Sequence, residues 1–355
     1  MLKFHSLKIK AKSAVAEDAV SITFDLPTHL REHYRFKAGQ HVAVRLPGAA
    51  EDTRRSYSIV SAMDSDDLSI GVRVLPGGQV SSFIGEVAEV GGTLEVLTPN
   101  GSFHTRIEPE RAKRYLAFAA GSGITPIVSI AKTILEREPR SRMVLFYGNR
   151  TAASTMFLDE IMGLKNRYIS RFAPHFLLSR EPQEIGLFNG RLDGARVREL
   201  AGAMFDVAAI DEYFICGPGS MVEDVRGALR ELGATGKIHT ELFTTAGSPV
   251  ERCAVVTPLS TSRDVTEVVV VMDGRQRNFS MPRNEFVLDA AGGAGLELPY
   301  SCRAGVCSTC RAKLVKGEIT MEQNMALEEW EVKAGYFLCC QARPTTERIE
   351  ITYDE

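Results

Sequence analysis

The feature that most constrains this chain is a group of cysteines near its C-terminal end. Cys302, Cys307 and Cys310 follow the spacing C-x₄-C-x₂-C, and the adjacent pair Cys339-Cys340 lies downstream. Three close thiolates with one distant thiolate are the ligand pattern of a [2Fe–2S] cluster, which moves one electron at a time. Structural zinc and disulfide pairing are weaker alternatives. A zinc site needs a second C-x₂-C or H-x₃₋₅-H pair, and none follows these cysteines.

The sequence around the cysteines resembles plant-type ferredoxins. The segment Leu298–Ser301 and the run Gly335–Cys340 are similar to the flanks of the ligands in that family. The resemblance implies a β-grasp fold over residues 264–355. In an extended segment successive side chains point to opposite faces, so only one of two adjacent cysteines can reach an iron. The resemblance assigns Cys302, Cys307, Cys310 and Cys340 as ligands and gives Cys339 the place of a small residue.

The length and composition of the chain restrict the number of domains and the class of protein. A chain of 355 residues suits two or three domains, and its 44% hydrophobic and 25% charged residues are typical of globular proteins. A net charge of −3 gives no support for a nucleic-acid partner. No apolar run approaches the ~18 residues of a membrane span, and no signal peptide is visible. Seven cysteines, an odd number, fit a reducing cytoplasm, where we expect the protein.

Residues 1–105 predict a small antiparallel β-barrel, because short alternating strands are separated by glycine and proline turns. In Arg55-Ser56-Tyr57-Ser58, an extended strand would put Arg55 and Tyr57 on one face and Ser58 on the other. The turn Gly77-Gly78 then leads into a short helix whose amides suit a phosphate. The expected strands are Leu7–Lys12, Ala19–Leu26, His41–Leu46, Asp67–Val74 and Thr93–Leu97.

These two elements, in this order, resemble the flavin domain of the ferredoxin–NADP⁺ reductase family. By itself the R-x-Y-S strand is better explained as an ordinary amphipathic strand. The resemblance implies an FAD-binding domain over residues 1–108. It places the flavin ring and phosphate at Arg55, Tyr57 and Ser58 with Arg73 nearby, and the pyrophosphate at Gly78, Val80 and Ser81.

From about residue 112, apolar strands alternate with helical stretches, which predicts a parallel sheet covered by helices. The glycine loop Ala120–Pro126 follows the first strand and opens the first helix, where glycines allow a pyrophosphate to approach the backbone. The expected elements are Arg114–Ala120, Ile127–Glu138, Met143–Gly148, Met156–Lys165, Arg171–Ser179, Ala195–Leu200, Glu212–Cys216 and Ser220–Leu232.

Three motifs in this α/β region are similar to those of the same reductase family, which implies an NAD(P)H-binding domain over residues 109–243. The loop GSGITP resembles the family's nucleotide loop, Cys216-Gly217-Pro218 its nicotinamide element, and Glu241-Leu242-Phe243 a segment near the flavin. Cys216 alone is as well explained by a buried core cysteine. The resemblance implies catalytic roles for Cys216, Glu241 and Ser58, and cofactor contacts from Gly121, Gly123, Thr125 and Phe243.

The predicted coenzyme is NADPH rather than NADH. Ser179-Arg180-Glu181 is similar to the segment that binds the 2′-phosphate in NADP⁺-dependent reductases, and Arg150 ends the preceding strand. A single arginine here would be read as a solvated surface residue. Two arginines at successive strand ends favour a phosphate.

Residues 244–263, rich in Thr, Ser and Pro, predict a tether to the C-terminal domain. The whole order resembles reductase components of bacterial multicomponent oxygenases, which pass electrons from NADPH through FAD and [2Fe–2S] to a terminal oxygenase. The resemblance is greatest to the reductases of phenylacetyl-CoA epoxidases, whose oxygenase is a di-iron protein. A Rieske-type or other aromatic-ring oxygenase is an alternative partner, and a redox sensor or electron carrier without substantial turnover is an alternative class.

The C-terminal region is the acidic part of the chain. Residues 264–355 carry 15 Asp and Glu against 10 Lys and Arg, a net charge of 10 − 15 = −5. We expect this charge to help the domain dock on its oxygenase. The densest candidate patch consists of Glu322, Glu328, Glu329 and Glu331.

Overall fold

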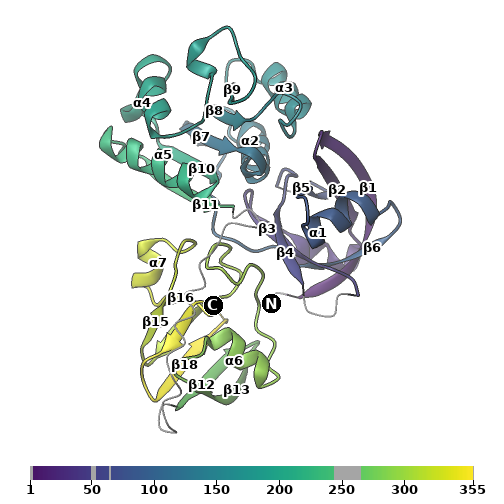
Figure 1. The fold of residues 1–355 in the computed structure, drawn as a ribbon, viewed down its shortest axis with the longest axis vertical. Helices are drawn as coiled ribbons and strands as arrows, with labels where there is room; N and C mark the ends of the chain where they lie inside the picture. The colour runs from purple at the N-terminus through teal and green to yellow at the C-terminus, as the bar shows by residue number, and fades with distance from the viewer. Residues whose placement is uncertain (1–2, 49–52, 64, 244–264, 355) are drawn as a thin grey trace. The chain divides into compact units, whose positions relative to one another are not determined.

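The computed structural model describes residues 3–48, 53–63, 65–243 and 265–354. They form two compact units, one on each side of residues 244–264 in the chain, as Figure 1 shows. The predicted tether at 244–263 lies outside the described residues. No helix in the described part of the chain combines the length and the apolar content that crossing a membrane requires.

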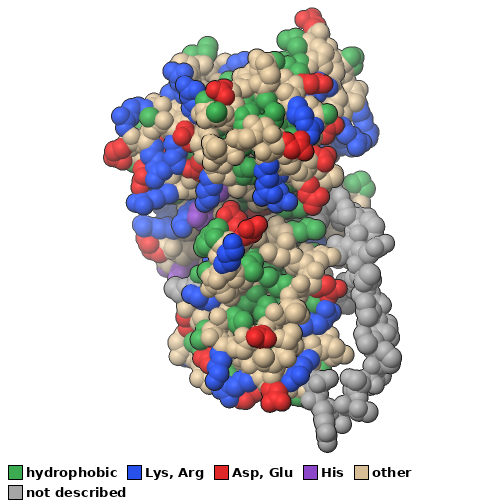
Figure 2. Space-filling view, turned by 90° about the vertical axis from the view of Figure 1, so that its left-hand side faces the viewer, with side chains coloured by type: hydrophobic (Ala, Val, Ile, Leu, Met, Phe, Trp, Pro, Cys, Tyr) green, Lys and Arg blue, Asp and Glu red, His purple; other side chains and the backbone are tan. Residues whose placement is uncertain are grey.

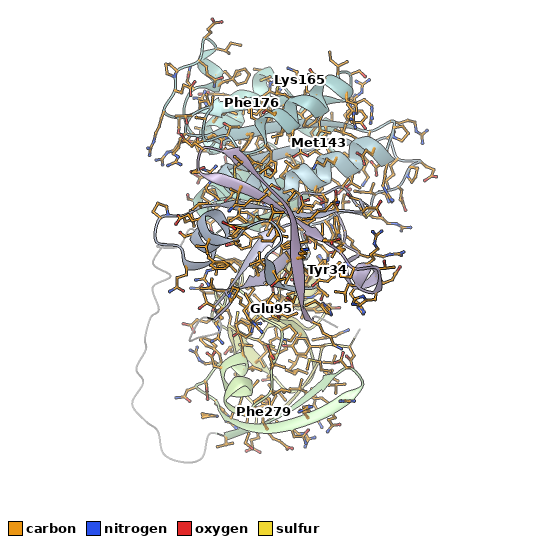
Figure 3. The ribbon with its side chains drawn as sticks, turned by 90° about the vertical axis from the view of Figure 1, so that its right-hand side faces the viewer. Tyr34, Glu95, Met143, Lys165, Phe176 and Phe279 are labelled. Atoms are coloured by element: carbon orange, nitrogen blue, oxygen red, sulfur yellow. The ribbon has the colours of Figure 1, made fainter. Side chains whose placement is uncertain are left out.

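The first unit begins with a six-stranded antiparallel sheet in the order β4-β3-β6-β1-β2-β5. A bridge between Ile59 and Ile70 joins its two edges and closes it into a barrel. Apolar side chains that alternate along the strands fill the interior, and the buried Tyr34, labelled in Figure 3, donates a hydrogen bond to the Val96 carbonyl at 2.7 Å. The strands are β1 (Phe4–Ala16), β2 (Ala19–Asp25), β3 (His41–Arg45), β4 (Arg54–Ser58), β5 (Leu68–Arg73) and β6 (Thr93–Leu97), with the helix α1 (Gln79–Ser82) after β5.

The same unit continues with a five-stranded parallel sheet in the order β11-β10-β7-β8-β9. Alternate residues of β7 face two cores: Ala117 and Ala119 pack with α2 and α3, whereas Leu116 and Phe118 pack with α4 and α5. Helices therefore cover both faces (Figure 1). The strands are β7 (Arg114–Ala120), β8 (Arg142–Asn149), β9 (Phe172–Leu178), β10 (Glu212–Gly217) and β11 (Lys237–Leu242); the helices are α2 (Ile124–Arg137), α3 (Leu158–Arg167), α4 (Gly194–Ala203) and α5 (Gly219–Glu231).

The predicted elements of both sheets are present, with small shifts at their ends. The clearest shift is in α3, which was expected from Met156 but begins at Leu158. Phe157 adopts a left-handed backbone with φ of 59°, which a helix cannot include. Its amide donates a hydrogen bond to the Val15 carbonyl of β1, so a contact with the barrel sets the start of this helix.

The second unit is a mixed five-stranded sheet in the order β13-β12-β18-β14-β16, in which only the β12–β18 pair is parallel. Helix α6 packs on it over Val268, Val270, Ile349 and Ile351. Phe279 of β13 is labelled in Figure 3. The elements are β12 (Val265–Met272), β13 (Arg275–Pro282), α6 (Val287–Gly293), β14 (Arg311–Lys316), α7 (Glu329–Lys333), β16 (Tyr336–Leu338) and β18 (Arg348–Thr352), with β15 (Ile319–Met321) and β17 (Ala342–Pro344) as a separate pair. The predicted fold class is confirmed for both units.

Candidate functional site

The carboxyl ends of β7, β10 and β11 bring three of the predicted residues together. Cys216 and Glu241 are register partners on β10 and β11, and the Cys216 Sγ lies 3.9 Å from the Glu241 Oε2. Gly123 packs directly against the end of β10, because a Cβ at this position would lie 2.2 Å from the Cys216 carbonyl oxygen. Position 123 is therefore restricted to glycine.

The barrel contributes a histidine to the same place. His41 begins β3 and is the cross-strand partner of Ser58 on β4. Its Nδ1 lies 3.7 Å from the Glu241 Oε1, and the two side chains are only 3% and 10% exposed. The sequence reasoning missed His41, because the pairing depends on the β3–β4 register and on a strand about two hundred residues away.

The environment of Cys216 keeps its sulfur protonated. Burial raises the pKa of this thiol well above its ordinary value, and the neighbouring Glu241 carboxylate raises it further. Cys216 is therefore a neutral side chain that can donate a weak hydrogen bond to Glu241. It is not an activated thiolate of the kind that nucleophilic enzymes use.

The nucleotide loop has the shape that a phosphate needs. Gly121 has φ of +55°, and no atom lies within 4 Å of the place that its Cβ would occupy. The Tyr147 hydroxyl donates to the Gly121 carbonyl at 2.9 Å, and the Thr125 hydroxyl donates to the Ser122 carbonyl at 2.9 Å. These two hydrogen bonds hold the loop in place. The space next to Gly121, just before α2, is not filled by neighbouring side chains.

The predicted flavin residues lie on β4 and at the start of α1. Arg55 and Tyr57 share one face of β4, and burial raises the pKa of the Tyr57 phenol. A Cβ at Gly78 would meet the Ser81 Oγ at 2.4 Å, so only glycine keeps this turn as it is. Val80 and Ser81 are buried beneath the turn. A bare backbone turn of this kind fits a pyrophosphate, as FAD requires.

Arg73 and Arg150 meet at Asp18 on the turn between β1 and β2. Arg73 Nη1 contacts both Asp18 oxygens at 2.7 and 2.6 Å, and Arg150 Nη2 contacts the Asp18 Oδ2 at 3.0 Å. The Arg73 Nε is buried without a hydrogen-bond partner. The sequence did not predict this arrangement. Two arginines against one aspartate give the cluster a net positive charge, and the Arg73 Nε is its buried donor without an acceptor. Ser179 and Arg180 follow β9 and are exposed.

Four of the cysteines in the second unit form two sulfur pairs. Cys302 is a close neighbour of Cys307, whose Sγ accepts a hydrogen bond from the Cys302 amide at 3.5 Å, and Cys310 is a close neighbour of Cys340. Each iron of a [2Fe–2S] cluster takes two protein ligands, so two pairs match its chemistry. Gly305, with φ of +72°, lies in the turn between Cys302 and Cys307, and the Ala304 amide donates to the Cys302 Sγ at 3.3 Å.

Cys339 has a different partner from these four cysteines. Its Sγ lies 3.0 Å from the hydroxyl of Tyr353, which follows β18. Cys339 is buried and Tyr353 is half-buried, and burial raises the pKa of the Cys339 thiol to about 12. The expected extended conformation is not found at this pair, because β16 ends at Leu338 and Cys339 and Cys340 lie in a turn closed by the Gln341 amide, which donates to the Leu338 carbonyl at 2.9 Å.

Three family models match the chain. The oxidoreductase FAD-binding domain matches residues 6–105, the oxidoreductase NAD-binding domain 118–227, and the 2Fe-2S iron-sulfur cluster binding domain 270–345. These matches confirm the predicted FAD, [2Fe–2S] cluster and nicotinamide nucleotide.

Relatives of established role match nearly the whole chain. One of the subunits of the 1,2-phenylacetyl-CoA epoxidase of Escherichia coli (strain K12) is 40% identical over 100% of this chain and 99% of its own length. The 3-ketosteroid-9-alpha-monooxygenase ferredoxin reductase component of Rhodococcus rhodochrous is 31% identical over 96% and 95%. The solved structure of phthalate dioxygenase reductase shares the fold, with a TM-score of 0.57 and 24% identity over 98% of both chains. The chain therefore belongs to the family of oxidoreductases that join FAD-binding, NAD-binding and [2Fe–2S] domains in one polypeptide as reductase components of oxygenases.

Proposed function

We propose that this protein is the NADPH-dependent reductase of a phenylacetyl-CoA epoxidase in the cytoplasm, and that its partner is the di-iron oxygenase of that system. The observation that carries the proposal is the 40% identity, along the entire chain, to a subunit of such an epoxidase. The bound FAD would convert the two-electron chemistry of the coenzyme into the one-electron chemistry of the cluster.

The residues of the first unit have distinct tasks in this proposal. Arg55, Tyr57 and Ser58 hold the flavin ring and its phosphate, and Gly78, Val80 and Ser81 hold the pyrophosphate. Gly121, Gly123 and Thr125 receive the coenzyme pyrophosphate, and Arg73 belongs with the flavin residues. Cys216, Glu241 and Phe243 line the place where the nicotinamide meets the flavin. The neutral Cys216 thiol and its 3.9 Å contact with Glu241 support a role in orienting the ring rather than in covalent chemistry.

In the second unit, Cys302, Cys307, Cys310 and Cys340 hold the cluster. The two sulfur pairs support this assignment, and so does the position of Cys339 against Tyr353. The amide and side-chain donors near the sulfurs would stabilise the negative charge of the reduced cluster.

The decisive experiment combines the purified protein with the di-iron oxygenase and phenylacetyl-CoA. We expect NADPH oxidation to be coupled to epoxidation of the thioester, and NADPH–ferricyanide activity in the absence of the oxygenase. Coupling to a 3-ketosteroid or aromatic-ring oxygenase instead would favour the alternative partner, which the 31% identical relative keeps open. Flavin and cluster that NADPH does not reduce would contradict a reductase.

Replacing Arg180 with alanine should weaken the use of NADPH while leaving NADH unaffected. Arg180 is exposed after β9, and its amide is bonded to the Arg150 carbonyl at 2.8 Å, which keeps the two arginines together. A charge-assisted hydrogen bond contributes about 1.5–3 kcal/mol, or roughly 10–150-fold in kcat/KM. The matched control is Arg167→Ala, at the exposed end of α3. Equal losses with both coenzymes would mean that Arg180 is structural.

A further inference from the structure

A chain of three buried polar groups crosses from the barrel to the parallel sheet. The Glu241 carboxylate lies between the other two, with Oε1 3.7 Å from the His41 Nδ1 and Oε2 3.9 Å from the Cys216 Sγ. All three side chains are at most 10% exposed. A carboxylate in such a place needs donors, because burial without them is costly.

The backbone of His41 is held by hydrogen bonds to Asn100. The His41 amide donates to the Asn100 carbonyl at 2.9 Å, and its carbonyl accepts from the Asn100 amide at the same distance. Gly101 has φ of +117°, and a Cβ there would lie 2.9 Å from the His41 Nδ1. The glycine thus leaves room for the imidazole at the point where it approaches Glu241.

The backbone of Glu241 is fixed separately. Two residues earlier on the same face of β11, the buried His239 bonds to Glu212 of β10 at 2.9 Å. This contact and the parallel register hold the strand, whereas the Glu241 carboxylate itself contacts His41 and Cys216. The orientation of the carboxylate therefore depends on the groups on either side of it, the Cys216 thiol at 3.9 Å and the His41 imidazole at 3.7 Å.

We propose that His41 is a positioning residue that binds Glu241 from the barrel and holds its carboxylate against Cys216, so that the barrel and the parallel-sheet domain are latched together at the nicotinamide end of the site. The inference rests on the proposed function for its catalytic consequence only. His41 lies on neither predicted phosphate loop, so its loss should lower kcat and leave the KM for NADPH nearly unchanged.

The first test measures the latch without any turnover. In the full chain, the rate at which iodoacetamide alkylates Cys216 is followed by mass spectrometry, since a fully buried thiol reacts only when the structure around it opens. We expect His41→Ala to raise this rate roughly tenfold or more, the scale of a lost partner beside a buried charge. His41→Gln keeps an N–H donor and should stay within about threefold of the original chain by the same scale.

The matched control is His5→Ala, which removes another barrel histidine, hydrogen-bonded to Tyr34 and not to Glu241. It should leave Cys216 alkylation unchanged. Because His41 acts through Glu241, His41→Ala should add nothing in a Glu241→Gln background. If His41→Ala does not fold, Glu241→Gln alone must give the same faster alkylation for the proposal to stand.

The second test is the split between kcat and KM in NADPH–ferricyanide turnover, where His41→Ala should lower kcat about tenfold. Unchanged alkylation and unchanged kcat would overturn the proposal. The proposal would also be overturned if the increase in alkylation rate in the double variant were the product of the increases in the two single variants. An unmodified chain without NADPH activity would refute the proposed function, while the alkylation series would still decide the latch.

Discussion

Cys340→Ser should abolish the visible absorption of the iron–sulfur cluster, whereas Cys339→Ser should preserve it. Cys340 is paired with Cys310 in one of the two sulfur pairs, whereas the Cys339 Sγ lies against the Tyr353 hydroxyl at 3.0 Å. Losing a ligand leaves the cluster with three protein thiolates instead of four, and cluster binding is part of the folding free energy of such a domain. Serine at 339 keeps a small group that can still bond to the Tyr353 hydroxyl.

The measurement is the iron content and visible spectrum of the two purified variants. Cys340→Ser should lose cytochrome c reduction but retain FAD and NADPH–ferricyanide activity, because those depend on the first unit. Cys339→Ser is the matched control, one residue away and also buried. If Cys339→Ser lost its iron and Cys340→Ser kept it, Cys339 rather than Cys340 would be the fourth ligand.

The sequence predicted those parts of the fold that local patterns encode. The strands and helices of the parallel sheet follow from the alternation of apolar runs, and the cysteine spacing follows from the needs of a two-iron cluster. His41 and Asp18 could not be found in this way. The role of each residue depends on partners that are distant in the sequence. His41 contacts Glu241, and Asp18 contacts Arg73 and Arg150.

The expected acidic docking patch shows the same limit. Glu331 is 1% exposed and bonds to Arg311 at 2.6 Å, so it belongs to the interior. Glu322 is paired with Arg343 at 2.7 Å. Figure 2 shows hydrophobic side chains on the surface of this unit among the charged ones, and the exposed Trp330 bonds to Glu328. Counting acidic residues in the sequence therefore overestimates the negative charge that this surface presents to a partner.

The second large effect concerns the buried ion cluster at the other end of β10 and β11. Glu212, 5% exposed, accepts hydrogen bonds from His239 at 2.9 Å and from Lys113. Burial alone would raise the pKa of the Glu212 carboxyl, but the bonds from His239 and Lys113 outweigh it and lower this pKa from 4.5 to about 2. Removing one partner of such a cluster leaves the others buried without compensation, which costs about 3–5 kcal/mol.

Glu212→Gln should therefore lower the calorimetric unfolding temperature of the first unit at pH 7 by roughly 6–20 °C, at about 2–4 °C per kcal/mol. The control is Glu231→Gln, which removes the exposed pair with Arg198 and should change the unfolding free energy by less than about 1 kcal/mol.

The dependence on pH distinguishes a charge effect from a packing defect. Because the folded pKa of Glu212 lies below its unfolded value, its contribution to stability is present above pH 4.5 and is lost as the pH falls toward 2. The difference of 4.5 − 2 = 2.5 pKa units corresponds to about 3 kcal/mol. The gap in unfolding temperature between the original chain and Glu212→Gln should thus be constant from about pH 7 to 5 and narrow below 4.5. A gap that stays constant down to about pH 3.5 would mean that Glu212 stabilises the strand ends through its shape and hydrogen bonds rather than through its charge.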